Sequence, residues 1–218
     1  MRNHYSMRYV KPVARLILRP LRRCLVLLAA AKTWLLRTDL PRWKRVSKQP
    51  PPWDERNRLL AALVPPGAAV LDLGCGAQTL RVHLKPGCHY QPCDIIPSSP
   101  DVIHCDFNSG NYPVLNRKYD FVVCSGVFEY TREPVRFIHE IKEYGRVLLL
   151  SFNPRRPAES LVGRFALGWV NHLSQDQIEG LFSDNGLVWR LVRRKPVPPA
   201  GDELIYELRR GDAQVVRK

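Results

Sequence analysis

A short apolar run in the first half of the chain ends in an acidic residue and two closely spaced glycines, Ala69–Gly76. Such a run suits a buried parallel strand and is too short for a helix. Because glycine has no Cβ, Gly74 and Gly76 can adopt positive φ and let a ligand approach the main chain closely. Asp72 supplies an acceptor near the carboxyl end of this strand, the edge at which open α/β sheets bind ligands. Taken alone, the motif is also compatible with a purely structural turn.

A second acidic residue, Asp94, stands 18 positions after Gly76, at the end of a second expected strand. An acid at about this spacing is the expected partner of a ribose diol. Residues 76–79 read Gly-Ala-Gln-Thr, which has neither the glycine spacing of a dinucleotide-binding dehydrogenase nor the Gly-Lys-Ser/Thr of a P-loop. The two segments therefore predict a site for an adenosine-like ligand without a pyrophosphate.

These segments resemble the class I S-adenosylmethionine (SAM) dependent methyltransferases, whose first motif is a hydrophobic strand followed by D/E-x-G-x-G-x-G. The resemblance is to the compact, type 11/12-like branch that acts on small molecules. It continues through residues 104–107 and 119–130, in the order in which the family places its third and fourth strands. The chain departs from the motif at Gln78, where the family has a third glycine.

The resemblance implies SAM as the cofactor and gives a role to individual residues. The residues that it assigns to cofactor binding are Asp72, Gly74, Cys75 and Gly76 at the methionine end, Asp94 with the adjacent Ile95 at the ribose, Asp106 and Phe107 at the adenine, and Ser125 and Gly126 beside the sulfonium.

Three residues are candidates for the acceptor side of the site. Methyl transfer from a sulfonium needs a base only when the acceptor carries a proton, so alignment is the main requirement. Glu129 and Tyr130 directly follow the expected fourth strand and can face the acceptor. His172 ends a long stretch between core elements and has an ordinary pKa near neutral pH. A solvent-facing Glu129 and a surface His172 are the alternatives.

No metal site is expected, because the six cysteines form no C-x-x-C pair and have no histidine at zinc-site spacing. Most of the cysteines fall on or beside expected strands. We therefore expect them to be reduced, partly buried small residues.

The predicted fold is a Rossmann-like, doubly wound α/β domain with a mostly parallel seven-stranded sheet. The resemblance implies that the last strand is antiparallel. Apolar runs between turn signals place the strands at residues 69–73, 88–93, 101–104, 119–124, 146–152, 187–192 and 204–208. Helices are expected over 53–64 and 80–84, from a cap at Thr131 or Arg132, and after a capping box of Ser174 and Gln177.

The net charge is concentrated in a basic helical N-terminal extension, residues 1–52, which the prolines at 50–52 separate from the domain at 53–218. Residues 1–50 hold 13 Lys and Arg and one acid, whereas the other 168 residues hold 21 bases and 19 acids. The apolar run Cys24–Ala31 is eight residues long, too short to span a bilayer. A basic helix with Leu and Trp suits an anionic membrane surface, which is our first interpretation of residues 1–50. A mitochondrial presequence, a signal-peptide core and a helix that covers the SAM pocket stay open.

The leading hypothesis is a SAM-dependent methyltransferase that acts on a small-molecule, sugar or lipid-linked acceptor. A nucleic-acid (RNA) methyltransferase that uses the basic arm is the first alternative. Residues 125–128 lack the [DN]-P-P-[YF] of amino-methylating nucleic-acid enzymes, which makes nucleic acid the less favoured partner. The second alternative is a non-catalytic methyltransferase-like partner protein, since Gln78 replaces a motif glycine. The expected location is the cytoplasm, with or without membrane association, and organellar targeting stays open.

Overall fold

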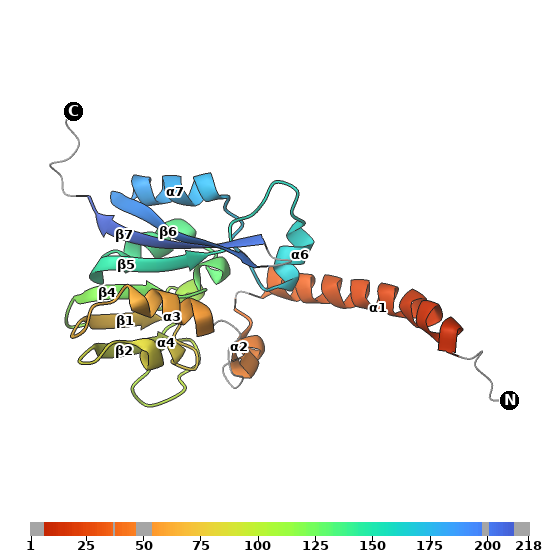
Figure 1. The fold of residues 1–218 in the computed structure, drawn as a ribbon, viewed down its shortest axis with the longest axis horizontal. Coiled ribbons are helices and arrows are strands. Elements are labelled where there is room, and N and C mark those ends of the chain that lie inside the picture. Colours follow the sequence, from red (N-terminus) through yellow and green to blue (C-terminus); the bar gives the residue numbers. More distant parts are fainter. Residues whose placement is uncertain (1–6, 37, 47–53, 198–200, 212–218) are drawn as a thin grey trace.

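The computed structural model describes residues 7–36, 38–46, 54–197 and 201–211 (Figure 1). The expected joint at residues 50–52 and the expected helix start at Trp53 lie outside these ranges.

The core of the molecule is one sheet with the strand order β3-β2-β1-β4-β5-β7-β6 (Figure 1). All neighbouring strands from β3 to β5 are parallel, whereas β7 is antiparallel to both β5 and β6. The strands are β1 (Ala69–Leu73), β2 (His89–Asp94), β3 (Ile103–His104), β4 (Tyr119–Cys124), β5 (Gly145–Phe152), β6 (Leu187–Val197) and β7 (Gly201–Arg210). The predicted fold class is confirmed, with the antiparallel last strand between two neighbours.

Helices cover both faces of the sheet because β1 and its neighbours are apolar on both sides. Leu71 of β1 belongs to the cluster that contains Ile138 and Phe182, whereas Val70 belongs to the cluster that contains Leu60 and Leu80. The helices of the domain are α3 (Asp54–Ala62), α4 (Thr79–His83), α5 (Pro134–Ile141), α6 (Leu161–Ala166) and α7 (Gln175–Asp184), with single 3-10 turns η1 (Phe107–Ser109) and η2 (Phe128–Tyr130). This is the doubly wound arrangement.

Local capping signals differ in how well they locate helix starts. The capping box of Ser174 and Gln177 is present at α7 and is confirmed. Thr131 or Arg132 is expected near the N-cap of α5, and the structure places the N-cap directly after them, at Glu133, with Pro134 in the first turn as expected. Thr131 instead donates its hydroxyl to the carbonyl of Phe128 and closes the 3-10 turn η2.

The β6–β7 hairpin is longer than predicted. The prediction ends one strand at residue 192 and begins the next at residue 204, but the pairing of the two strands continues from Arg193 to Val197. Apolar patterning cannot reveal this extension, because its residues are largely charged, including the cross-strand pair Arg194 and Asp202, 2.9 Å apart. The extension brings Lys195 and Glu203 to the carboxyl edge of the sheet.

The N-terminal extension contains α1 (Met7–Leu35) and α2 (Leu40–Val46). α1 runs outward from the domain beside α6, and α2 lies at the carboxyl edge of the sheet (Figure 1). Among the described helices, none combines the length and the apolar character needed to cross a membrane.

Two of the six cysteines are joined, contrary to the expectation that all are reduced. Cys93 at the end of β2 and Cys105 after β3 form a disulfide, with a Cα–Cα distance of 6.3 Å. Neighbouring parallel strands bring them together, since Cys93 pairs with Ile103 in the sheet. Sequence separation alone carries no sign of this pairing.

The turn after β1 keeps the backbone shape of a three-glycine motif although its third glycine is missing. Gly74, Gly76 and Gln78 all have positive φ, at 73°, 52° and 57°. Gln78 is the only non-glycine residue with positive φ in the described part of the chain. Its side chain donates a hydrogen bond of 2.7 Å to the Ser99 hydroxyl, which helps to offset the cost of this conformation.

We predict that position 78 tolerates glycine and rejects a β-branched residue. Gln78→Gly should leave the free energy of unfolding within ~1 kcal/mol of wild type, because relief of the left-handed conformation offsets the lost hydrogen bond. Gln78→Val should cost ~2 kcal/mol. Arg81→Val, at a helical position of α4, is the matched control and should cost less than ~1 kcal/mol. Equal losses for the two valine variants in denaturant titrations would contradict this view of the turn.

Candidate active site

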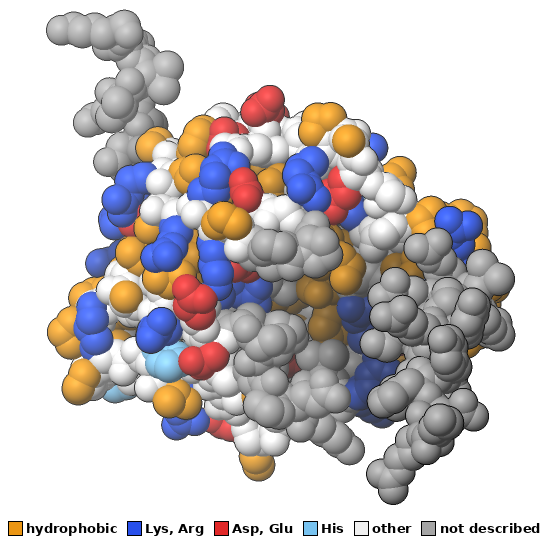
Figure 2. Space-filling model, turned by 45° about the vertical axis from the view of Figure 1, so that its right-hand side comes forward, with side chains coloured by type: hydrophobic (Ala, Val, Ile, Leu, Met, Phe, Trp, Pro, Cys, Tyr) orange, Lys and Arg blue, Asp and Glu red, His pale blue; other side chains and the backbone are white. Residues whose placement is uncertain are grey.

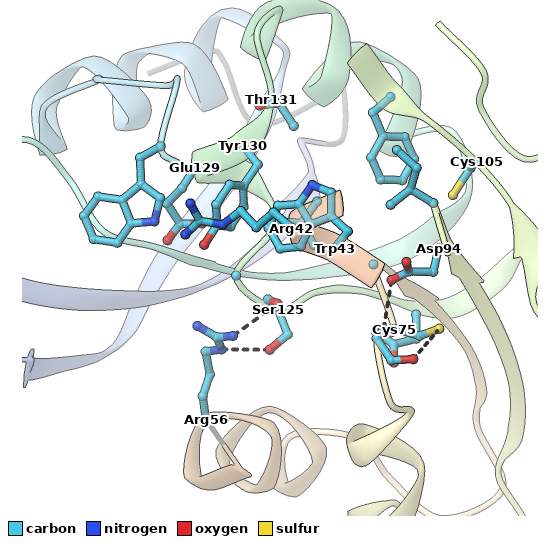
Figure 3. Close-up of a pocket in the computed structure, with 18 of the residues that line it drawn as sticks. Arg42, Trp43, Arg56, Cys75, Asp94, Cys105, Ser125, Glu129, Tyr130 and Thr131 are labelled. Carbon is cyan, nitrogen blue, oxygen red and sulfur yellow. Dashed lines mark hydrogen bonds between the residues drawn. The ribbon is translucent and has the colours of Figure 1, made fainter. Parts of the chain in front are cut away.

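A cavity of about 490 Å³ lies at the carboxyl edge of the sheet, over the ends of β1, β2 and β4. Its floor is the turn after β1, and α2, η2 and the segment after α6 form its other walls. In Figure 3, Asp94 and Cys75 lie on one side of this pocket and Glu129, Tyr130 and Arg42 on the other. All the predicted cofactor residues line the pocket, namely Asp72, Gly74, Cys75, Gly76, Asp94, Ile95, Asp106, Phe107, Ser125 and Gly126.

The glycine turn is tied to the neighbouring strand by its main chain. The amides of Gly74 and Cys75 donate to the carbonyl of Cys93, at 2.7 and 3.1 Å. A Cβ on Gly74 would lie 2.2 Å from Val127, so this position has no room for a side chain. A Cβ on Gly76 would meet no atom within 4 Å, because Gly76 faces the open pocket. A ligand can therefore lie directly against the backbone there.

Asp94 links the turn to the second strand. One carboxylate oxygen accepts from the amide of Gly76 and the other from the amide of Ile96, both at 2.8 Å. Burial raises the pKa of Asp94, and these amide donors oppose that rise. Each oxygen keeps a further lone pair for a hydroxyl donor. The carboxylate is thus held in place and can accept from a ribose diol.

Asp72 lies deeper in the same wall. The Tyr90 hydroxyl donates to its Oδ2 over 2.6 Å. Burial raises the pKa of Asp72 to about 7, against the lowering effect of that hydrogen bond. A carboxyl group at this position is therefore sensitive to a charged ligand group near it, as expected at the methionine end of a SAM site.

Asp106 and Phe107 lie together at the far end of the pocket. The Asp106 carboxylate caps η1, since it accepts from the amide of Asn108 and the hydroxyl of Ser109. It also accepts from the Thr38 hydroxyl at 3.1 and 3.2 Å, which ties the N-terminal extension to the pocket. Phe107 is partly buried and supplies an aromatic wall next to Tyr112. This pair suits a flat base.

A polar network that the sequence analysis missed supports Ser125 and Gly126. The Arg56 guanidinium of α3 donates to the hydroxyl of Ser125 at 2.9 Å (Figure 3). It also donates to the carboxylate of Glu203 at 2.6 Å. Asn57 accepts from the Ser125 hydroxyl at 2.5 Å. Gly126 has a φ of 65°, and a Cβ there would lie 2.3 Å from this guanidinium, so both its backbone conformation and its surroundings favour glycine. Arg56 and Glu203 both line the pocket and are buried.

Glu129 presents a buried carboxylate with one free oxygen. Its Oε1 accepts from the backbone amide and the side-chain Nδ2 of Asn153, at 2.9 and 2.6 Å. Its Oε2 is buried and has no partner among the described residues, and the residue is only 1% exposed. Arg164 donates to the Asn153 carbonyl at 2.9 Å and fixes this arrangement from behind. Burial raises the pKa of Glu129, although Arg56 lowers it in part.

Tyr130 lies on the same wall, where its ring packs edge-on against Trp43 of α2 at 4.6 Å between centroids. Burial raises the pKa of its hydroxyl, so the phenol is protonated at neutral pH. Trp43 and Trp169 line the pocket beside it. The sequence analysis missed Trp43, because it lies in the extension, whereas Trp169 belongs to the long stretch before His172 that was expected to face the acceptor.

His172 does not reach the pocket, which corrects its candidate role as a base. Its Nδ1 accepts from Arg164 at 3.2 Å, and its ring packs edge-on against Phe165. Burial and the charge of Arg164 lower its pKa. These contacts hold His172 against α6.

The nearby carboxylates and cysteines do not gather around a point where a metal ion could sit. Within the described ranges there is no group of three or more His, Cys, Asp or Glu side chains arranged for metal binding.

The sequence model of a family described as a methyltransferase domain matches residues 43–191. The chain belongs to this methyltransferase family. The match starts at Trp43 and ends within β6, so the family segment includes most of α2, the five strands from β1 to β5 and the first part of β6. This match confirms the prediction of a methyltransferase.

Solved methyltransferase structures share the fold. One is a 1,6-didemethyltoxoflavin N1-methyltransferase from Burkholderia thailandensis with S-adenosylhomocysteine bound: 16% identity, 74% of this chain and 79% of that chain covered, TM-score 0.57. Another is the magnesium protoporphyrin IX methyltransferase from Synechocystis: 20% identity, 78% and 94% covered, TM-score 0.52. No curated protein sequence matches the chain significantly. At these identities the likeness concerns the fold.

The pocket of this methyltransferase fits SAM chemically. Open space over Gly76 accommodates a ligand against the main chain, and the fixed carboxylate of Asp94 can accept from its ribose. Asp72 would face the amino-acid end and Phe107 the adenine. No pyrophosphate-binding glycine spacing is present, in keeping with a cofactor that carries none.

We predict that Asp72 makes the ligand-free protein less stable as the pH rises. Its pKa is raised from 3.8 to about 7, so the folded state binds more protons than the unfolded state between these values. The free energy of unfolding should therefore fall from pH 4 to pH 7, by up to ~4 kcal/mol from this group. Asp72→Asn should abolish that part of the fall in denaturant titrations. The exposed Asp184→Asn should keep the wild-type fall, and a fall unchanged in Asp72→Asn would contradict the assignment.

Proposed function

We propose that the enzyme methylates a small-molecule acceptor, including sugar or lipid-linked ones, with Glu129 as the group that receives the acceptor proton. The observation that carries this proposal is the buried, unpartnered Oε2 of Glu129 in the wall of the pocket. An unpaired carboxylate oxygen in a buried site is costly, so its retention points to a ligand that donates to it.

The pocket residues would have different roles in the reaction. SAM, when bound, supplies a methyl group already activated by the positively charged sulfur. Glu129 would accept a hydrogen bond from the nucleophile and then its proton, and its raised pKa makes it a stronger base than an exposed glutamate. Asn153 holds Glu129 in place through two hydrogen bonds. Tyr130 and Trp43 would position the acceptor and exclude water.

The size and chemistry of the pocket support a small acceptor. The structure from Burkholderia thailandensis contains 1,6-didemethyltoxoflavin, and the Synechocystis enzyme is named for magnesium protoporphyrin IX. The non-catalytic alternative rested on Gln78, yet Gln78 adopts the positive φ of the glycine it replaces. The exposed leucines of α1 argue against the nucleic-acid alternative, because leucine side chains between the basic residues cannot bind phosphates.

We also propose that residues 1–52 are a membrane-directed extension and residues 53–218 the catalytic domain, located at the cytoplasmic side of an anionic membrane. The charge of residues 1–50 supports this division, with 13 bases and one acid. The extension also contributes to the site, because Thr38, Arg42 and Trp43 line the pocket.

We predict that Glu129→Gln lowers methyl transfer by 10²- to 10⁴-fold, because the amide cannot accept the proton. Transfer from [methyl-³H]SAM into small-molecule and lipid extracts measures this. The wild-type rate should rise with pH and reach half its maximum above the ordinary glutamate pKa of 4.5. Glu140→Gln, on the exposed side of α5, is the control and should retain full activity. Full activity of Glu129→Gln would disprove the role of Glu129.

A further inference from the structure

Exposed apolar side chains cover one face of α1. Leu21, Leu25, Leu28 and Leu35 follow helical spacing and share this face, with exposed fractions from 54% to 71%. Trp34 lies exposed in the same last turns. Hydrophobic and basic side chains lie together at the right-hand side of Figure 2, where α1 comes forward. A face this apolar is a contact surface rather than a solvated one.

α6, which packs beside α1 and ends at the rim of the pocket, carries exposed apolar side chains of its own. α1 packs against α6, whose Leu161 and Val162 are exposed. Leu167, at the end of α6, is 43% exposed and also lines the pocket. The Arg42 guanidinium of α2 donates to the carbonyl of Leu167, so α2 and α6 meet at this rim. The leucines of α1, together with Leu161, Val162 and Leu167, are called the apolar strip below.

The charges beside the apolar strip favour an anionic bilayer as its partner. Arg22 and Arg23 of α1 are exposed next to the leucines, and Arg45 of α2 is exposed near the pocket. Residues 1–50 contain a single acid, Asp39, which pairs with Lys32 at 2.8 Å. Basic side chains around an apolar helix face match the headgroups and acyl chains of an anionic membrane.

Hydrogen bonds at its C-terminal end hold α1 to the wall of the pocket. Arg132, which follows η2, donates to the carbonyls of Thr33 and Leu36, at 2.6 and 2.5 Å, and so caps the end of α1. Thr38 is bonded to Asp106 in the pocket wall. If the apolar strip lies in the headgroup region, the rim at Leu167 therefore lies there too.

We propose that the acceptor is a membrane-embedded amphiphile, which deepens and rests on the proposed function. Its apolar chain lies along the apolar strip, and its polar head enters past Leu167 and Trp43 toward Glu129. The aromatic wall of Trp43, Tyr130 and Trp169 contacts the segment between chain and head. An acceptor dissolved in water would need no apolar approach to the rim.

A series of alkyl glucosides below their micelle concentrations tests the chain-binding path, with tryptophan fluorescence as the readout. Affinity should increase from hexyl to octyl to decyl glucoside, by up to about fourfold per added methylene. Leu167→Asp should abolish the dependence on chain length, whereas Val114→Asp, at a 96% exposed position outside the pocket lining, should preserve it. Affinity that ignores chain length, or an unchanged series in Leu167→Asp, would overturn the proposal.

Two further experiments distinguish a failure of this proposal from a failure of the proposed function on which it rests. The full chain should sediment with phosphatidylglycerol-containing vesicles and not with neutral ones, and Leu25→Asp/Leu28→Asp should weaken this at least tenfold. If those variants instead dissociate a dimer of the free protein, a second copy covers the apolar strip and the proposal is wrong. S-adenosylhomocysteine binding should be unchanged in Val114→Asp and in Leu25→Asp/Leu28→Asp, which lie outside the pocket lining. If the wild type does not bind S-adenosylhomocysteine, the proposed function itself is wrong. If it binds S-adenosylhomocysteine but glucoside affinity does not depend on alkyl chain length, only the proposal of an amphiphilic acceptor is wrong.

Discussion

The turn after β1 is held against the end of β2 by hydrogen bonds from three consecutive amides, and the site depends on this link. Gly74 and Cys75 donate to the Cys93 carbonyl, and Gly76 donates to the carboxylate of Asp94. These bonds fix the positive φ values of the turn and aim Asp94 into the pocket. Because the two strands are parallel and adjacent, the same link positions the backbone and the acid that a SAM-like ligand would use.

The sequence was sufficient wherever a feature depends on local pattern. The glycine turn, the acid at the end of β2 and the capping box at Ser174 follow from residue types at fixed spacing, so they were predictable. The mostly parallel seven-stranded sheet with its antiparallel last strand was predictable from the resemblance, whereas the order of the strands was not predicted. Gln78 looked like a defect in the motif, yet the backbone conformation, not the residue type, is what the turn preserves.

The parts that escaped prediction depend on contacts between distant segments. Arg56 and Glu203 stand 147 positions apart and meet only because the charged half of the β6–β7 hairpin extends over the pocket. Trp43 enters from the extension, so dividing the chain by charge hid its role in the site. His172 was chosen for its pKa, but packing against Arg164 directs it away from the cavity.

The central claim is that Asp94 binds the cofactor as well as supporting the turn, and calorimetry with S-adenosylhomocysteine tests it most directly. The wild type should bind one molecule per chain, and Asp94→Ala should weaken binding at least tenfold. Asp120→Ala removes a carboxylate that likewise accepts a backbone amide, that of Ala69, but lies outside the pocket lining, so its affinity should equal wild type. Equal affinities in all three proteins, or no binding at millimolar ligand, would contradict the account.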